Sequence, residues 1–235
     1  MSKVAIMQPY LFPYIGYFQL MAYVDVFVIY DNLKYTKKGW INRNRILVNG
    51  KDEYLSIPLK NASDYLLIKE RSLANSSAKD KVKTLNKIVG AYSKAPFFNE
   101  TIPVIERCLA NHDSNLFKFI FHSIVEFKKH LQIDTELAIS SEIQIDHSLR
   151  SKDKVIAICK AMKMQHYVNP IGGTELYNKD EFAQEGIKLE FLKANNIEYA
   201  QLGNSFVPYL SIIDVLMFNG IANVKNLLRK EYTLH

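Results

Sequence analysis

The chain has 235 residues, of which 48% are hydrophobic and 12% aromatic, and this composition excludes an intrinsically disordered protein. Its two cysteines, Cys108 and Cys159, exclude a disulfide scaffold and indicate a reducing compartment, so we expect a cytoplasmic protein. The net charge of +6 suits an anionic small molecule, a carrier protein or RNA without selecting one of them.

The first part of the chain has the pattern of a strand, a helix and further strands. Short β-branched or aromatic runs, each bounded by Pro, Gly, Asn or Asp, predict strands at residues 3–7, 25–30, 45–48 and 53–57. Residues 16–23, between the first two strands, can form a short helix. We therefore predict a β-turn-α-β unit whose first two strands are parallel neighbours.

The middle of the chain has a different pattern. Residues 78–132 carry apolar positions at helical spacing and predict three helices. Beyond residue 150 we predict strands at 166–169 and 187–192 and helices at 151–163, 180–185 and 211–219. No linker rich in Pro, Gly or Ser divides the chain, and no run reaches the roughly 18 apolar residues that a membrane span requires. We thus predict one α/β domain over residues 1–235, a three-layer Rossmann-like parallel sheet with a helical insertion at about 78–132.

The first candidate segment joins the end of the first predicted strand to the first helix. Open α/β sheets bind ligands at the carboxyl ends of their strands, which makes Gln8, Tyr10 and Tyr17 candidate ligand contacts. Gly16 allows close approach of the backbone, and the amides at the start of the next helix can face an anion. The alternative is a turn stiffened by proline whose aromatic rings belong to the core.

This strand-loop-helix arrangement resembles the nucleotidyltransferase plan, in which a His-x-Gly-His motif lies beneath the phosphates of a nucleotide. Tyr14 and Tyr17 occupy the two histidine-like positions around Gly16. Because the imidazoles are missing, the resemblance implies a nucleotidyltransferase-like topology rather than that reaction.

The second candidate segment follows the second predicted strand. Asp31 ends an apolar strand, where a sheet can point a carboxylate into a crevice, and it is our candidate general base. Trp40 can stack on a flat ring, and Arg43 can hold a phosphate or carboxylate through two parallel hydrogen bonds. Lys37 adds positive potential and Asn44 adds an amide. The alternative is a solvated basic loop with Trp40 packed inward.

The third candidate segment lies near the C-terminus. Gly172 and Gly173 follow a predicted strand and can cradle a ligand with their backbone amides. Ser211 and Asp214 have the spacing of a helix capping box, and Gly220 stands where the end of a helix favours positive φ. Asp214 therefore has two interpretations: a part of the helix start, or a carboxylate that projects into the cleft.

Several chemistries lack their sequence signals. The chain contains no Gly-x-Ser-x-Gly nucleophile motif and no P-loop, and its six histidines lack metal-ligand spacing. We therefore predict no metal site and cannot name a cofactor. His166, at the start of a predicted strand, is the histidine that we would test as a base.

Three motifs together resemble the WbqC-like protein family. They are Gln-Pro-x-x-x-Pro-x-x-Gly-Tyr-Phe at Gln8 to Phe18, Trp-x-x-Arg at Trp40 to Arg43, and Leu-Ser-x-x-Asp-x-x-Phe-Asn-Gly at Leu210 to Gly220. Such proteins are commonly encoded among bacterial surface-polysaccharide genes, including clusters for amino-acylated amino sugars. The resemblance implies the decoration of a sugar by acyl or aminoacyl transfer to an amine.

Our first hypothesis is a transferase of O-antigen type polysaccharide synthesis that acts on an amino-sugar nucleotide. Asp31 would be the base for the sugar amine, Arg43 would hold the diphosphate, and Trp40 or Tyr10 would stack on a ring. The acyl donor would be bound to an acyl carrier protein or to tRNA. The alternatives are a non-catalytic ligand-binding or scaffold protein of the same pathway, and an enzyme of nucleotidyl transfer.

Overall fold

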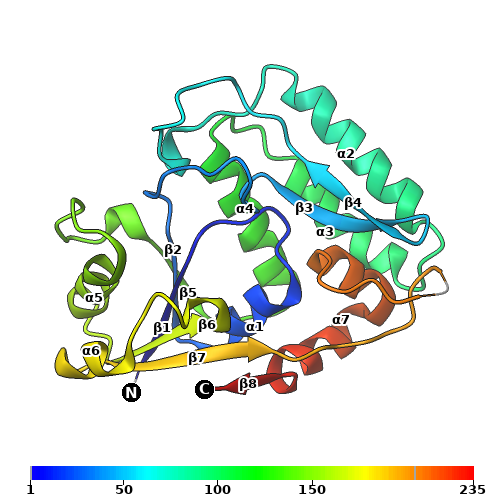
Figure 1. Ribbon diagram of the computed structural model, residues 1–235. Helices are drawn as coiled ribbons and strands as arrows, with labels where there is room; N and C mark the ends of the chain where they lie inside the picture. Colours follow the sequence, from blue (N-terminus) through cyan, green and yellow to red (C-terminus); the bar gives the residue numbers. More distant parts are fainter. Residues whose placement is uncertain (1, 204) are drawn as a thin grey trace.

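The centre of the molecule is a six-stranded sheet (Figure 1). The computed structural model describes residues 2–203 and 205–235. The strands are β1 (Lys3–Met7), β2 (Val26–Ile29), β5 (Glu136–Ile139), β6 (His166–Pro170), β7 (Lys188–Ala194) and β8 (Tyr232–Leu234). They lie in the order β5-β2-β1-β6-β7-β8, and every neighbouring pair is parallel except β7 and β8.

Helices cover both faces of this sheet, because successive strand residues point to opposite sides and both sides are buried. Val4 and Ile6 of β1 belong to one core cluster, together with residues of α5 (Ser151–Ala161) and α6 (Lys179–Gln184). Ala5 belongs to the cluster on the other face, together with residues of α1 (Ile15–Tyr23) and α7 (Ile212–Lys230). The predicted three-layer Rossmann-like fold is confirmed, and so is the parallel pairing of the first two strands.

Two of the predicted strands form a hairpin apart from the main sheet. β3 (Arg43–Val48) and β4 (Lys51–Ser56) pair antiparallel. Asn49 and Gly50 join them with positive φ at both residues, which is the geometry that a two-residue hairpin turn favours. The hairpin packs against the helical layer that follows it, so its residues lie beside the sheet instead of extending it (Figure 1).

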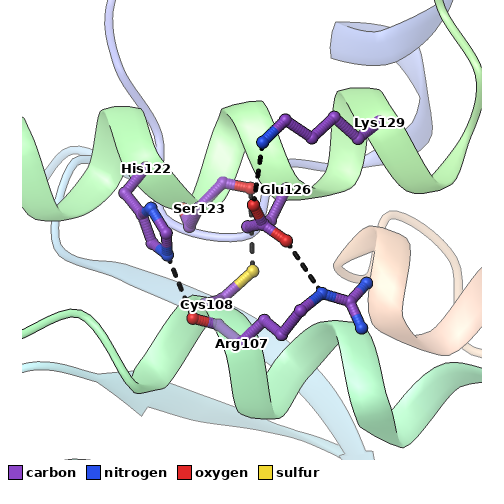
Figure 2. A network of polar contacts seen from close by, with 6 residues as sticks. All are labelled: Arg107, Cys108, His122, Ser123, Glu126 and Lys129. Atoms are coloured by element: carbon purple, nitrogen blue, oxygen red, sulfur yellow. Dashed lines mark hydrogen bonds and ion pairs between the residues drawn. The ribbon is translucent and has the colours of Figure 1, made fainter.

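Three helices follow the hairpin and confirm the predicted helical region: α2 (Ser77–Tyr92), α3 (Phe98–Leu109) and α4 (Leu116–His130). The polar network in Figure 2 joins α3 to α4, since Arg107 Nε donates to Glu126 Oε2 at 2.8 Å and His122 Nε2 lies 3.0 Å from the Arg107 carbonyl. Cys108 is buried in this interface, and burial raises the pKa of its thiol well above the ordinary value. The network therefore stabilises the contact between α3 and α4, and Cys108 is a poor nucleophile.

The last helix is longer than its sequence pattern indicates. Gly220 has φ 67° and ψ 165°, as the prediction of a positive φ requires, but helical geometry resumes after it and continues to Lys230. A Cβ atom at Gly220 would lie 2.6 Å from the Phe97 ring, so a larger residue would force the two segments apart. The break at Gly220 confirms the predicted end of the first helical segment at residue 219, whereas the second segment, which continues to Lys230, and the strands β5 and β8 were not predicted. Among the described residues, no helix is long and apolar enough to cross a bilayer.

Candidate functional site

A pocket of about 770 Å³ opens at the carboxyl ends of β1 and β6, the strands at the centre of the sheet. The chain leaves β1 toward β2 on one side, and it returns to β6 on the other side, so this is the topological switch point where open α/β sheets bind ligands. Gln8 follows β1, Asn169 lies in β6 and Lys193 lies in β7, while Gly16 and Ser151 come from the first turns of α1 and α5. We call this cavity the switch-point pocket.

The walls of the switch-point pocket combine aromatic rings with positive charge. Its aromatic residues are Tyr10, Tyr14, Tyr30, Trp40, Tyr167, Tyr177 and Tyr209. Arg45 and Lys193 are its charged residues, and no Asp, Glu, His or Cys is among the lining residues. Burial raises the pKa of Tyr10 and of Tyr14, which keeps both phenols neutral. A ligand with a flat ring and an anionic group suits such walls.

The loop between β1 and α1 is held from two distant parts of the chain. Asn44 Nδ2 donates to the carbonyls of Leu11 at 3.0 Å and Phe12 at 2.8 Å. Ser211 Oγ donates to the same Phe12 carbonyl at 2.7 Å. The Leu11 amide also donates to the carbonyls of Trp40 at 3.2 Å and Ile41 at 3.1 Å, so the three sequence motifs meet at this loop. Phe12 keeps an unfavourable φ of 45° because the bonds to its carbonyl fix it.

Close packing at the start of α1 sets the shape of one wall. A Cβ atom at Gly16 would lie 2.4 Å from the Tyr14 ring, so the ring lies directly against the backbone of the glycine. Tyr14 stands at the N-cap of α1 and gives no side-chain cap to the amides of the first turn. These amides and the positive end of the helix dipole favour an anion near Gly16.

Arg45 takes the place in the pocket that the sequence suggested for Arg43. Arg45 donates to Asp52 at 2.9 Å, its Cζ lies 5.6 Å from the Trp40 ring centroid, and its buried Nε has no partner among the described residues. Arg43 donates instead to the carbonyls of Gly39 at 3.0 Å and Lys38 at 2.6 Å, and it does not line the pocket.

The two candidate bases lie outside the switch-point pocket. Asp31 is 1% exposed, and its carboxylate accepts hydrogen bonds from the Ser141 amide at 2.9 Å and the Ser141 hydroxyl at 2.6 Å. His166 lies at the amino end of β6, where its Nε2 is 3.0 Å from Glu190 Oε2 and burial lowers its pKa. The catalytic roles of both residues stay predictions.

Asp214 is fully buried in a cluster of its own. It accepts hydrogen bonds from Tyr92 at 2.8 Å, Tyr199 at 2.7 Å and Gln201 at 2.7 Å, and burial raises its pKa. Ser211, three residues earlier, caps α7 through the amide of Ile213 at 3.2 Å. Asp214 thus connects α7 to α2 and to the 199–201 segment, away from the pocket walls.

The switch-point pocket brings together about half of the residues expected at the site. Those that line it are Gln8, Tyr10, Gly16, Trp40, Asn44, Gly172 and Gly173. Tyr17 is buried beside it and donates to the Gln8 carbonyl at 3.2 Å, while Lys37 is exposed and pairs with Asp64 at 2.9 Å. Among the described residues, no group of three His, Cys, Asp or Glu side chains is placed to hold a metal ion.

Sequence reasoning did not select several polar lining residues as site residues, among them Arg45, Asn169, Lys193 and Tyr209. Asn169 and Lys193 follow the same rule that selected Gln8, since each lies near the carboxyl end of a parallel strand. Arg45 lies two residues beyond Arg43 in β3, so both side chains point to the same face of the strand, and the local pattern that selected Arg43 does not distinguish it from Arg45. Tyr209 reaches the pocket only through the tertiary fold.

Comparisons with known proteins give two matches. The WbqC-like protein family matches residues 8–226, which is nearly the whole chain and includes all three motifs. A Mycobacterium tuberculosis protein, Uncharacterized protein Rv1507c, is 28% identical over 233 residues, covering 97% of this chain and 98% of that protein.

Proposed function

Because the chain belongs to the WbqC-like protein family, we propose that it is a transferase of bacterial surface-polysaccharide synthesis, of the O-antigen type. The switch-point pocket binds an amino-sugar nucleotide, and the reaction adds an acyl or aminoacyl group to the sugar amine. The observation that carries this proposal is an aromatic pocket with two cations and no lining carboxylate at the switch point of a Rossmann-like sheet.

The size and charge of the pocket support a ligand of this class. Its volume of about 770 Å³ lies within the usual range for small-molecule sites, which is roughly 300 to 1,000 Å³. Arg45 and Lys193 supply charge for a diphosphate, and Arg45 Nε is a buried donor without an acceptor in the part of the chain that the structure describes. Trp40 and the tyrosines supply faces for a base or a sugar.

A second candidate function is a binding or scaffold protein that presents the nucleotide sugar to partner enzymes. The absence of Asp, Glu, His and Cys from the described pocket walls favours it, because the usual general bases and nucleophiles are missing there. Amide formation from an activated donor depends strongly on how the two substrates are positioned, so we favour the transferase over the scaffold protein. In either case the ligand and its pocket are the same.

Isothermal titration calorimetry with UDP-glucosamine, a nucleotide sugar with a free amine, tests the shared premise. We expect saturable binding to the natural protein, a loss of about 1.5 to 3 kcal/mol for Arg45→Gln, and no loss for Lys37→Gln. Lys37 is the matched control because it is a cation in the same region that lies outside the pocket. Equal binding by the two variants would overturn the assignment of Arg45, and binding of ATP with Mg²⁺ alone would favour nucleotidyl transfer.

A further inference from the structure

A second pocket, of about 260 Å³, adjoins the switch-point pocket. The two share four lining residues, Tyr14, Ala194, Asn196 and Tyr209. Tyr14 is fixed against Gly16, and the Tyr209 hydroxyl donates to Asn196 Oδ1 at 3.2 Å. This shared wall separates two compartments that lie next to each other, an arrangement that a reaction between two substrates requires.

The walls of the second pocket have the opposite charge to those of the first. Its apolar lining consists of Ile15, Ala194, Ile197, Phe206, Pro208, Leu210 and Val215. Glu198 is the charged residue among its lining residues, which include no Lys, Arg or His. Within the described part of the chain, Glu198 forms no ion pair. Glu198 is exposed, so its charge acts modestly: it disfavours an anion here and offers an ammonium group a partner.

Hydrogen bonds on both sides hold the segment that forms this pocket. The Asn195 amide donates to the Glu231 carbonyl at 3.0 Å. The Gln201 side chain donates to the Val207 carbonyl at 3.1 Å and accepts from the Val207 amide at 2.8 Å. Tyr199 is held by Asp214 at 2.7 Å and packs against Phe206 at 5.1 Å between ring centroids. The pocket is therefore a formed part of the fold.

We infer that the second pocket is a donor subsite for an aminoacyl group that carries a free α-ammonium. Glu198 contacts the ammonium, and the apolar wall takes the uncharged side chain of the amino acid. Glu198 is exposed, so it offers an ammonium group a modest ion pair that an uncharged acyl chain cannot form, and this favours aminoacyl over acyl transfer. This inference rests on the proposed function, because the acceptor is the amine of the nucleotide sugar in the switch-point pocket.

The reaction across the shared wall joins an amine and an activated aminoacyl ester or thioester. The sugar nitrogen attacks the carbonyl carbon of the donor, a carbon-nitrogen bond forms, and the carbon-oxygen or carbon-sulfur bond breaks. The departing oxygen or sulfur keeps the bonding electron pair, and it receives through solvent the proton that the amine loses. No oxidant or metal is needed for this balance.

Two small esters test the charge preference of the second pocket. They are L-alanine methyl ester and methyl L-lactate, and they differ only in that the first carries an ammonium group where the second carries a hydroxyl. Saturation-transfer NMR titrations at about pH 6.5 keep the α-amino group charged, since its pKa is roughly 7.7 to 8.0. We expect the alanine ester to bind about two- to fivefold more tightly, the range for an exposed ion pair. Glu198→Gln should remove this preference, while Glu106→Gln, an exposed glutamate on α3, should keep it.

The same samples are titrated with UDP-glucosamine, so that the two proposals fail separately. Saturating nucleotide sugar should leave binding of the alanine ester in place, because the ligands occupy different compartments. Equal binding of the two esters, an unchanged preference in Glu198→Gln, or competition with the nucleotide sugar would overturn the donor subsite. Failure of the nucleotide sugar to bind the natural protein would instead overturn the proposed function.

Discussion

The switch-point pocket and the Asp214 cluster are both rich in polar and aromatic residues, and they differ in how the polar groups are partnered. In the cluster, Asp214 is fully buried and accepts three hydrogen bonds at 2.7 to 2.8 Å. In the pocket, Arg45 keeps a buried Nε without a partner among the described residues. A buried polar side chain whose hydrogen bonds are all made stabilises the fold, and an unpartnered one that also lines a pocket marks where a ligand can bind.

The largest effect that can test this contrast is expected at Asp214. Asp214→Ala leaves the hydroxyls of Tyr92 and Tyr199 and the Gln201 amide without their acceptor in a buried site. We expect the free energy of unfolding to fall by about 3 to 5 kcal/mol, measured by urea denaturation. A variant with natural stability and weakened nucleotide-sugar binding would make Asp214 a ligand residue and break the comparison.

A smaller effect is expected at Asp31, whose two carboxylate oxygens also accept hydrogen bonds within the protein. Asp31→Asn replaces one of the acceptors for the amide and hydroxyl of Ser141 by a donor. We expect a loss of about 1 to 3 kcal/mol in the free energy of unfolding, with the affinity for UDP-glucosamine unchanged. If instead transfer activity disappears while stability is retained, Asp31 is the general base after all.

The smallest effect is a change in the pH dependence of stability. Burial raises the pKa of Asp214 above its ordinary value of 3.8, so folding favours the protonated form. The stability that this proton supplies is present below pH 3.8 and is lost as pH rises through the higher pKa of the folded state. Urea denaturation at a series of pH values should show this loss in the natural protein and not in Asp214→Asn. If the free energy of unfolding depends on pH in the same way in both proteins, the pKa of Asp214 is not raised by folding.

The strands and the position of the pocket could be predicted from local sequence. Val4 to Met7 and Val26 to Ile29 are β-branched runs, and they became β1 and β2 in the predicted parallel pair. The strand-end rule then led directly to Gln8 and Tyr10. β8 has three residues and pairs only with β7, so its existence depends on a contact that no local pattern encodes.

Whether an individual side chain lines the pocket depends on residues that are far from it in the sequence. Asp214 is directed away from the pocket by Tyr92, which lies 122 residues earlier in the chain. Arg43 and Arg45 are equivalent in the local pattern, and the position of the hairpin against Trp40 decides which of them lines the pocket. Sequence alone therefore located the region of the site better than its members.

The sole tryptophan allows the most direct test of the central claim, that the switch-point pocket binds a nucleotide sugar. Trp40 lines this pocket, and the chain has no other tryptophan to add background fluorescence. Titration with UDP-glucosamine should change the Trp40 emission saturably, and Arg45→Gln should shift the curve to higher concentration by at least about tenfold. Binding detected by calorimetry without any change in Trp40 emission, or with the same curve for Arg45→Gln, would contradict the account.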